Sequence, residues 1–378
     1  MRFRSCFGVS QVKALSSRFR RLYSHLRPQG RRPSFGIAFD IDGVIIRGGN
    51  PIGGSPQALS RLHAEDGTLK IPYIFLTNGG GVPESKRASE LSGLLGVQIL
   101  ALQVVQGHSL FRDLLSRFEN DLIVAVGKGE PAKVMLEYGF KKVLSIDEYA
   151  SFFKDIDPLS QYKTWRINQN YEIMKNMNGL YSRYNVDSDA VKGTFIVSDP
   201  VDWGRDIQVL CDILSCGGLP GKAKGHQPAL YFASDDLEYQ AAFPSERLGM
   251  GAFRIALESI FNSCSVNSTP LWYTSFGKPN PYVFKIAESV LMQVASTRYG
   301  GQCTVDDTKE NKFSTIYMIG DNPMVDIKGA TKAGRPWFSI LTRTGVFKGK
   351  DNHQEYPADI VVENVEEAVE YILKKEAF

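Results

Sequence analysis

Cysteine is scarce in this sequence, because the 378 residues contain only five. No two cysteines form a Cys-x-x-Cys pair, and Cys211 and Cys216 lack cysteine or histidine partners at the spacing of a zinc site. We therefore expect reduced, partly buried thiols and no zinc-binding module. The remaining cysteines are Cys6, Cys264 and Cys303.

Long apolar runs are also missing. A membrane-spanning helix needs about 18 consecutive apolar residues, whereas runs such as 37–39 and 122–126 are only long enough for strands. With 43% hydrophobic and 22% charged residues, the composition is that of an ordinary globular protein. We expect no transmembrane segment, and the length of the chain predicts two domains.

Acidic residues are absent before Asp40, although nine basic residues precede it. Without these nine, the chain has 35 basic and 41 acidic residues. An Arg- and Ser-rich segment without acids or a long apolar centre predicts mitochondrial targeting over residues 1–33, with cleavage after Tyr23 and a matrix location. The alternative is a basic arm for nucleic acid or anionic lipid. The slightly acidic remainder argues against a nucleic-acid partner.

Strands and helices alternate on both sides of a long middle section. Uninterrupted apolar strands suit a sheet that is buried on both faces, and the alternation predicts an α/β fold with a doubly wound, Rossmann-like parallel sheet. The expected strands are 35–39, 71–76, 315–319, 337–341 and 359–362. The expected helices are 55–63, 83–95, a helix that starts at 279 or 281 and runs to about 294, 325–333 and 365–375.

The middle section has its own alternating pattern, which predicts a large inserted α/β domain. Its expected strands are 122–126, 193–197 and 229–233, and its expected helices are 129–138, 203–214 and 250–261. We therefore predict a core of residues 34–102 and 272–378, with an inserted domain over 103–271.

Two aspartates, Asp40 and Asp42, follow the first expected strand in the segment Asp-Ile-Asp-Gly. Ligands bind at the carboxyl ends of strands in an open parallel sheet. One carboxylate could attack phosphorus, and the other could protonate the leaving oxygen. Both could also bind Mg²⁺, which prefers oxygen ligands. The competing interpretation is an Asp-Gly turn with a surface acid.

Candidate phosphate-binding groups follow at two places. Thr77-Asn78-Gly79 comes after the second expected strand, where a hydroxyl, an amide and glycine N–H groups could hold phosphate oxygens. Lys278 precedes an expected helix and could neutralise both phosphate and Asp40. Each signal is weak alone, because Asn-Gly is a common turn and a single lysine is usually a solvated surface residue.

Two further acids, Asp321 and Asp326, lie in the segment Gly-Asp-Asn-Pro-Met-Val-Asp. Asp321 follows an expected strand, and Asp326 lies in the first turn of the next expected helix. Clustered acids of this kind are what a metal site needs. Asp326 could instead only complement the helix dipole.

Together, the four segments resemble the four signature motifs of the haloacid dehalogenase superfamily in their order and context. The resemblance implies that Asp40 is the nucleophile and forms an aspartyl phosphate, and that Asp42 is the general acid and base. It also implies that Thr77, Asn78 and Gly79 hold the phosphate.

The resemblance further implies that Lys278 stabilises the charge on the phosphate. Mg²⁺ would be bound by the carboxylates of Asp40 and Asp321 and by the backbone carbonyl of Asp42. Asp326 would orient metal-bound water or Lys278.

The position of the insertion indicates a branch of the superfamily. Only 34 residues separate Asp42 from Thr77, whereas about 200 separate Thr77 from Lys278. This layout is similar to that of class IIA, which has a C2-type cap and includes nitrophenyl, sugar and nucleotide phosphatases. The segments 199–203 and 243–253 most resemble the mitochondrial haloacid dehalogenase-like hydrolases of fungi and animals.

Two loops of the inserted domain could touch a substrate. Asp199, Asp202, Trp203 and Arg247 are candidates, but we expect the acids to cap a helix and the tryptophan to pack in the core. Related sequences tend to carry Ser-Asn-Pro-Asp where this chain has Ser234-Asp235-Asp236. We therefore assign no ligand role to that loop.

The resemblance implies a Mg²⁺-dependent phosphomonoester hydrolase acting on a small phosphorylated metabolite. A nucleotide, a sugar phosphate or a lipid headgroup phosphate would each fit, and an oligomer is left open. Two alternatives remain: a phosphotransferase, and a catalytically weak binding or regulatory protein of the mitochondrion, since a fold alone does not establish activity.

Overall fold

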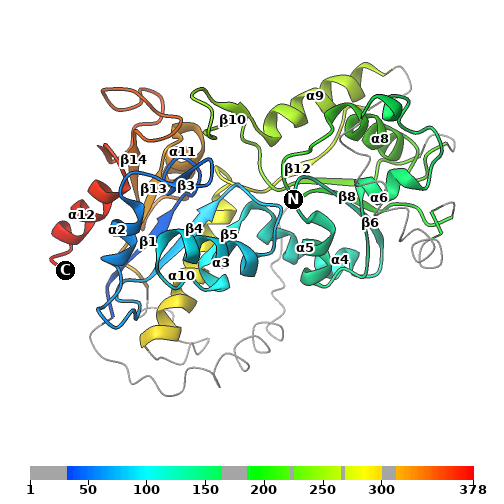
Figure 1. Cartoon of the computed structure of the whole chain (residues 1–378). Coiled ribbons are helices and arrows are strands. Elements are labelled where there is room, and N and C mark those ends of the chain that lie inside the picture. Colours follow the sequence, from blue (N-terminus) through cyan, green and yellow to red (C-terminus); the bar gives the residue numbers. More distant parts are fainter. Residues whose placement is uncertain (1–31, 164–184, 187, 222–224, 265–268, 300–311) are drawn as a thin grey trace.

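The computed structural model describes residues 32–163, 185–186, 188–221, 225–264, 269–299 and 312–378. Nearly all of the expected targeting segment, with its cleavage site, lies outside these ranges. The chain forms two parallel sheets with their own helices, which lie side by side (Figure 1). We call the part built on the six-stranded sheet the core and the part built on the five-stranded sheet the cap. No helix within the described ranges is long and apolar enough to cross a membrane.

The core sheet has the strand order β15-β14-β13-β1-β4-β5, and all its neighbours are parallel. The chain winds outward from β1 in one direction and later from β13 in the other, as in a doubly wound fold, so the switch point lies between β1 and β13. The strands are β1 (Phe35–Phe39), β4 (Tyr73–Thr77), β5 (Val104–Gln106), β13 (Thr315–Gly320), β14 (Trp337–Thr342) and β15 (Ile360–Val362).

Helices cover both faces of the core sheet because its central strands are apolar throughout. All five residues of β1 are buried, and their side chains alternate between two hydrophobic clusters. One face packs against α2 (Ser55–Ser60), α3 (Glu84–Leu95) and α12 (Val365–Lys375). The other packs against α10 (Pro281–Tyr299) and α11 (Lys328–Ala333). The predicted doubly wound α/β core is confirmed.

The cap sheet has the order β12-β9-β8-β6-β7, again with parallel neighbours. Its switch point lies between β6 and β8. The strands are β6 (Leu122–Val126), β7 (Lys142–Ser145), β8 (Gly193–Ile196), β9 (Ala229–Phe232) and β12 (Thr274–Ser275). The helices are α4 (Leu115–Phe118), α5 (Pro131–Tyr138), α6 (Ile146–Ser151), α8 (Trp203–Ser215) and α9 (Met250–Ser263).

Short elements complete the described part of the chain. Two antiparallel ribbons are β2 (Ile46–Arg47) with β3 (Asn50–Pro51), and β10 (Glu238–Tyr239) with β11 (Arg247–Leu248). Single helical turns and short segments are η1 (Ala101–Gln103), η2 (Gly107–Leu114), η3 (Ser160–Tyr162) and η5 (Pro323–Ile327).

Strand pairing departs from the expected limits of the insertion at both ends. Residues 104–106 form β5, which pairs with β4 in the core, although we expected the insertion to begin at 103. Residues 274–275 form β12, which pairs with β9 in the cap, although we expected the insertion to end at 271. Strands of three and two residues are too short to give a periodic pattern in the sequence.

Candidate active site

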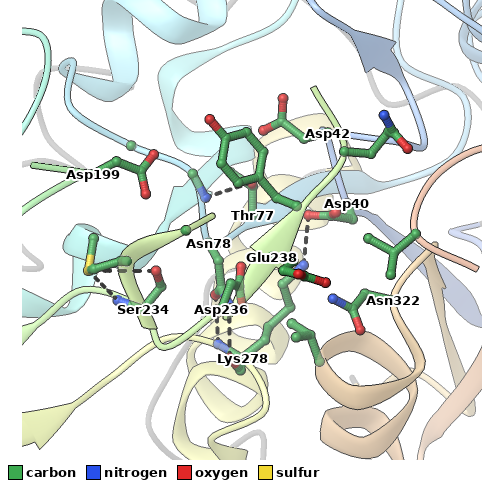
Figure 2. Close-up of a pocket in the computed structure, with 18 of the residues that line it drawn as sticks. Asp40, Asp42, Thr77, Asn78, Asp199, Ser234, Asp236, Glu238, Lys278 and Asn322 are labelled. Carbon is green, nitrogen blue, oxygen red and sulfur yellow. Dashed lines mark hydrogen bonds and ion pairs between the residues drawn. The ribbon is translucent and has the colours of Figure 1, made fainter. Parts of the chain in front are cut away.

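The four predicted segments meet at the carboxyl edge of the core sheet (Figure 2). Asp40 follows β1 and Asp321 follows β13, and these two strands are neighbours in which Phe39 pairs with Ile319. The N–H of Asp40 donates to the carbonyl of Ile319 at 2.8 Å. Both aspartates therefore lie at the switch point, where this class of sheet binds its ligands.

Lys278 forms ion pairs with Asp40 and Asp326. Its Nζ lies 2.7 Å from Oδ1 of Asp40 and 2.6 Å from Oδ1 of Asp326. Only 1% of the Lys278 side chain is exposed. Burial alone would lower the pKa of Lys278, but the charges of Asp326 and Asp40 raise it above its ordinary value, so the lysine stays protonated. Burial raises the pKa of Asp40, and the charge of Lys278 counters that rise.

Three buried carboxylates form a cluster that could hold a cation. Oxygens of Asp40, Asp321 and Asp326 lie within 4.8 Å of one another. Burial, followed by the charges of Asp40 and Asp326, raises the pKa of Asp321 well above its ordinary value. Oxygen donors whose negative charges oppose one another in a buried site fit Mg²⁺. The Asp42 carboxylate is not in this cluster, so it could contribute to such a site only through its backbone.

The carboxylate of Asp321 is held in place by backbone groups that lie close to it. Its Oδ2 accepts a hydrogen bond from the N–H of Val346 at 2.7 Å. A Cβ at Gly345 would lie 1.8 Å from the same oxygen, and a Cβ at Gly43 would lie 2.5 Å from it. Gly43 also has a φ of 86°, which favours glycine. Only residues without side chains fit at these two positions.

The side chain of Asn78, a predicted phosphate ligand that lines the cavity, is hydrogen-bonded within the protein. Its Nδ2 donates to Oδ1 of Asp236 at 2.7 Å and to the carbonyl of Lys278 at 2.9 Å. Its Oδ1 accepts from the N–H of Lys278 at 2.7 Å. Both amide donors are therefore committed, and the side chain fixes the segment that carries Lys278. Thr77 and Gly79 line the cavity, as expected, with the N–H of Gly79 donating to the Thr77 hydroxyl at 3.0 Å.

Asp236 is a site residue that the sequence did not reveal. It follows β9 of the cap, lines the cavity and contacts Asn78 of the core (Figure 2). Burial raises its pKa to about 8, although Lys278 and the hydrogen bond from Asn78 lower it. We had assigned no ligand role to this loop because it lacks the usual Asn-Pro. The available signal was the position of an acid just beyond an apolar strand.

Asp42 lies where both parts of the molecule contribute charge. Burial raises the pKa of Asp42, while the charges of Arg87 and Lys128 lower it and that of Asp199 raises it. Arg87 comes from α3 of the core, whereas Lys128 and Asp199 follow β6 and β8 of the cap. A raised pKa favours the protonated carboxyl, which suits a proton donor to a leaving oxygen.

Comparison with known proteins identifies the family. Residues 37–141 match the family described as haloacid dehalogenase-like hydrolase, and residues 275–368 match the family described as HAD-hydrolase-like. The mitochondrial hydrolase YKR070W of Saccharomyces cerevisiae is 32% identical over 356 residues, covering 90% of this chain and 96% of that protein. The chain belongs to the haloacid dehalogenase-like hydrolase family.

A second relative of this hydrolase is a fusion protein. The cardiolipin synthase (CMP-forming)/mitochondrial hydrolase fusion protein of Schizosaccharomyces pombe is 34% identical over 345 residues. The match covers 90% of this chain but only 53% of that protein, so the hydrolase spans about half of its length.

Solved structures of low sequence identity share the fold of this hydrolase. The 4-nitrophenylphosphatase of Thermotoga maritima superposes with a TM-score of 0.56 at 19% identity, over 90% of this chain and 97% of that one. The glycerol phosphate phosphatase of Mycobacterium tuberculosis gives 0.51 at 18% identity, over 88% and 74%. These likenesses extend over both sheets.

The candidate cap residues of the hydrolase separate into two groups. Asp199 lines the cavity and pairs with Lys128 at 2.7 Å, so it is part of the site and not a helix cap. Asp202 caps α8 by accepting from the N–H of Arg205, and Trp203 packs against Phe253. These two roles are the structural ones that we expected. Arg247 is exposed and is absent from the cavity lining.

A buried network of polar side chains joins the core and the cap beside Gly80, in the loop that follows β4. Tyr138 of α5 in the cap donates to Oε1 of Glu84 in α3 at 2.6 Å, and Nδ1 of His108 lies 2.7 Å from the same hydroxyl. Arg112 pairs with Glu84 at 2.8 Å. Burial lowers the pKa of His108 to about 4, so this imidazole is neutral near pH 7. A Cβ at Gly80 would lie 2.5 Å from the imidazole ring of His108, so the network packs against the loop that follows β4.

Proposed function

We propose that this enzyme is a Mg²⁺-dependent phosphomonoester hydrolase in which Asp40 is the nucleophile. The observation that carries the proposal is the position of Asp40 at the sheet switch point, 2.7 Å from the buried cation Lys278 and within a cluster of carboxylates. Asp42, with its raised pKa, lines the same cavity. Together these groups supply a nucleophile, a charge-stabilising cation and a proton donor.

In the first step, a carboxylate oxygen of Asp40 attacks the phosphorus of the ester. The bond between phosphorus and the leaving oxygen breaks, and Asp42 donates its proton to that oxygen, so the alcohol departs neutral. The product on the enzyme is an aspartyl phosphate. Lys278 and the hydroxyl of Thr77 stabilise negative charge on the phosphoryl oxygens during this transfer.

In the second step, water replaces the alcohol. Asp42, now ionised, accepts a proton from the water, whose oxygen attacks phosphorus and breaks the bond to Asp40. Inorganic phosphate leaves, and both aspartates return to their starting states. Mg²⁺ bound by Asp40 and Asp321, and by the Asp42 carbonyl, would neutralise phosphoryl charge. Asp326 fixes Lys278, from which it lies 2.6 Å away.

The cavity and the relatives support a small phosphorylated metabolite as the substrate. Its walls are polar and come from both sheets, which fits the expectation of a small phosphorylated metabolite. A nucleotide, a sugar phosphate or a lipid headgroup phosphate all carry the required phosphomonoester. The fusion with a cardiolipin synthase in one relative favours testing a lipid headgroup phosphate early. We also propose a mitochondrial location, because the two relatives described above carry the words mitochondrial hydrolase in their names. The proposal of the matrix rests on the Arg- and Ser-rich first 33 residues.

The test is phosphate release by the full chain from a panel of phosphomonoesters, with Mg²⁺ and with chelator. We expect metal-dependent release, and we expect Asp40→Asn to lower it by a factor of about a thousand or more while preserving the fold, because the two side chains have similar size. Comparable rates for Asp40→Asn and the parent would exclude the nucleophile. If less phosphate were released than ester consumed, and the missing phosphoryl groups were found on an added alcohol, the enzyme would be a phosphotransferase. No consumption of any ester by the folded, metal-loaded chain would favour a binding role.

A further inference from the structure

Three cationic side chains line the cavity in the described part of the chain, and two of them are already neutralised there. Lys278 pairs with Asp40 and Asp326, and Lys128 pairs with Asp199 at 2.7 Å. All of these acids also line the cavity. The charge of these two lysines is therefore balanced before any substrate enters.

Arg87 is the third cation, and its ion-pair partner lies outside the cavity wall. Within the described residues, its one ion pair is with Glu90, one turn along α3, at 3.4 Å between Nη1 and Oε2. Glu90 is 42% exposed and is absent from the cavity lining. A long pair of this kind on a helix surface contributes roughly 0–1 kcal/mol. The guanidinium thus brings a positive charge to the cavity, and no carboxylate of the described cavity wall forms an ion pair with it.

The guanidinium also has an unmet hydrogen bond. The Nε of Arg87 is buried and has no acceptor among the described residues, and 20% of the Arg87 side chain is exposed. Buried N–H groups are nearly always paired, and leaving one unpaired is costly. The Nε and Nη donors form a planar fork that matches two oxygens of a carboxylate or a phosphate. Arg87 therefore has both the charge and the free donor of an anion-binding group.

The place of Arg87 indicates which part of a substrate it meets. Arg87 lines the same cavity as Asp42 and the two glycines that follow Asn78. Under the proposed function, Asp42 protonates the leaving oxygen. Arg87 forms no ion pair with Asp40, Asp321 or Asp326 in the described part of the chain, so it is available to the alcohol portion of an ester whose phosphate lies at that cluster.

We propose that Arg87 binds a second anionic group, a carboxylate or a phosphate, on the alcohol portion of the substrate. This inference rests on the proposed phosphomonoesterase function and narrows its substrate class. The preferred esters carry an anion a few atoms from the scissile oxygen, where the guanidinium fork can receive it. Neutral alcohols of the same length leave the fork unpaired.

A matched series of two-carbon esters tests the inference on the full chain with Mg²⁺. The series is 2-phosphoglycolate, ethylene glycol bisphosphate, 2-hydroxyethyl phosphate and O-phosphoethanolamine, which differ in the terminal group alone. We expect kcat/KM for at least one of the two anionic esters to exceed that for the hydroxyethyl ester by about tenfold or more. The carboxylate and phosphate arms distinguish the two sources of the anion.

Arg87→Gln should remove this preference by lowering kcat/KM for the anionic esters about tenfold, with a change of less than about twofold for the hydroxyethyl ester. Arg61→Gln, at an exposed arginine that is absent from the cavity lining, is the matched control and should change neither. An equal fall for all esters, or no preference in the parent, would overturn the inference while leaving the phosphatase function intact.

Direct binding keeps the inference testable if no ester is hydrolysed, which would count against the proposed function itself. Calorimetric titration of the Mg²⁺-loaded chain with 2-phosphoglycolate and with ethylene glycol bisphosphate would then be compared between the parent and Arg87→Gln. At least about tenfold weaker binding to the variant supports the anion site. Equal affinities reject it.

Discussion

Asn78 and Asp236 are joined by a hydrogen bond of 2.7 Å that links the end of β4 in the core to the loop after β9 in the cap. The same amide exchanges two hydrogen bonds with the backbone of Lys278. One side chain therefore links the cap loop and Lys278 to the end of β4. Asp236 acts as a positioning residue, because it orients Asn78 and does not itself need to touch the reacting atoms.

Asp236→Ala should therefore impair catalysis, although Asp236 takes no part in the proposed chemical steps. The change leaves a buried donor of Asn78 unpaired, at a cost of about 1–3 kcal/mol, and loosens the Lys278 segment. We expect kcat to fall by about ten- to a hundredfold with a smaller change in KM, measured with a phosphomonoester at saturating Mg²⁺. Asp236→Asn retains an acceptor and should restore most of the rate.

Asp235 supplies the matched control for this experiment. It precedes Asp236 in the same loop but pairs with Arg254 at 2.5 Å and is 36% exposed. We expect Asp235→Ala to leave kcat within about twofold of the parent, since exposed pairs contribute little. If Asp235→Ala and Asp236→Ala were equally slow, the loop as a whole would matter and the bond to Asn78 would not.

Asp321→Asn should stabilise the metal-free protein and at the same time abolish its response to Mg²⁺. Burial and the charges of Asp40 and Asp326 raise the pKa of Asp321, which means that its ionised form is disfavoured in the folded state. Without metal at pH 7, the neutral amide removes that cost and should raise Tm by a few degrees, at about 2–4 °C per kcal/mol. Mg²⁺ should raise the Tm of the parent but not of the variant. A metal-free variant that melts below the parent would contradict this electrostatic account.

Gly345→Ala should disable the same metal position without changing any charge. The added Cβ would lie 1.8 Å from Oδ2 of Asp321, so that carboxylate or its loop must move. We expect the Mg²⁺-induced rise in Tm to disappear and phosphate release to fall at least about tenfold. Gly93→Ala is the control, because a Cβ there meets nothing within 4 Å. Normal Mg²⁺ response in Gly345→Ala would show that the loop yields freely.

His108 should make the free energy of unfolding depend on pH. Burial lowers its pKa from 6.5 to about 4 in the folded state, so between these values the unfolded chain binds more protons. The contribution is fully present above about pH 6.5 and is lost as the pH falls towards 4, by up to about 3 kcal/mol.

Denaturant unfolding of the parent and of His108→Gln at several pH values between 4 and 7 would measure this contribution. The difference between the two free energies should shrink steadily on acidification, because glutamine does not titrate. A constant difference across the range would show that His108 is not buried in its neutral form.

The sequence predicted those elements whose signals are local. The bounds of β1, β6 and α12 agree with expectation, because each is an uninterrupted apolar run or a periodic helix with a clear cap, such as Asn364 before α12. The convergence of the four motif segments also follows from a simple rule, since the carboxyl ends of parallel strands share one edge. The shared edge brings together Asp40 and Asp321 from 281 residues apart.

The parts that escaped prediction depend on contacts between distant segments. The hydrogen bond from Asn78 to Asp236 spans 158 positions, and no local pattern announces it. The strands β5 and β12 are held by pairing with neighbours and not by their own propensity. The hydrogen bonds of the Asn78 amide could not be predicted for the same reason, because only the fold brings its partners near.

The short strand β12 has one more consequence. It is hydrogen-bonded to the cap sheet, where Ser275 pairs with Phe232, and Lys278 follows three residues later. Lys278, the cation of the proposed mechanism, is thus connected to the cap sheet through β12 and to Asn78 of the core through a hydrogen bond. A movement of the cap away from the core would strain this connection. Under the proposed function, placing the cap over a substrate would therefore also place Lys278.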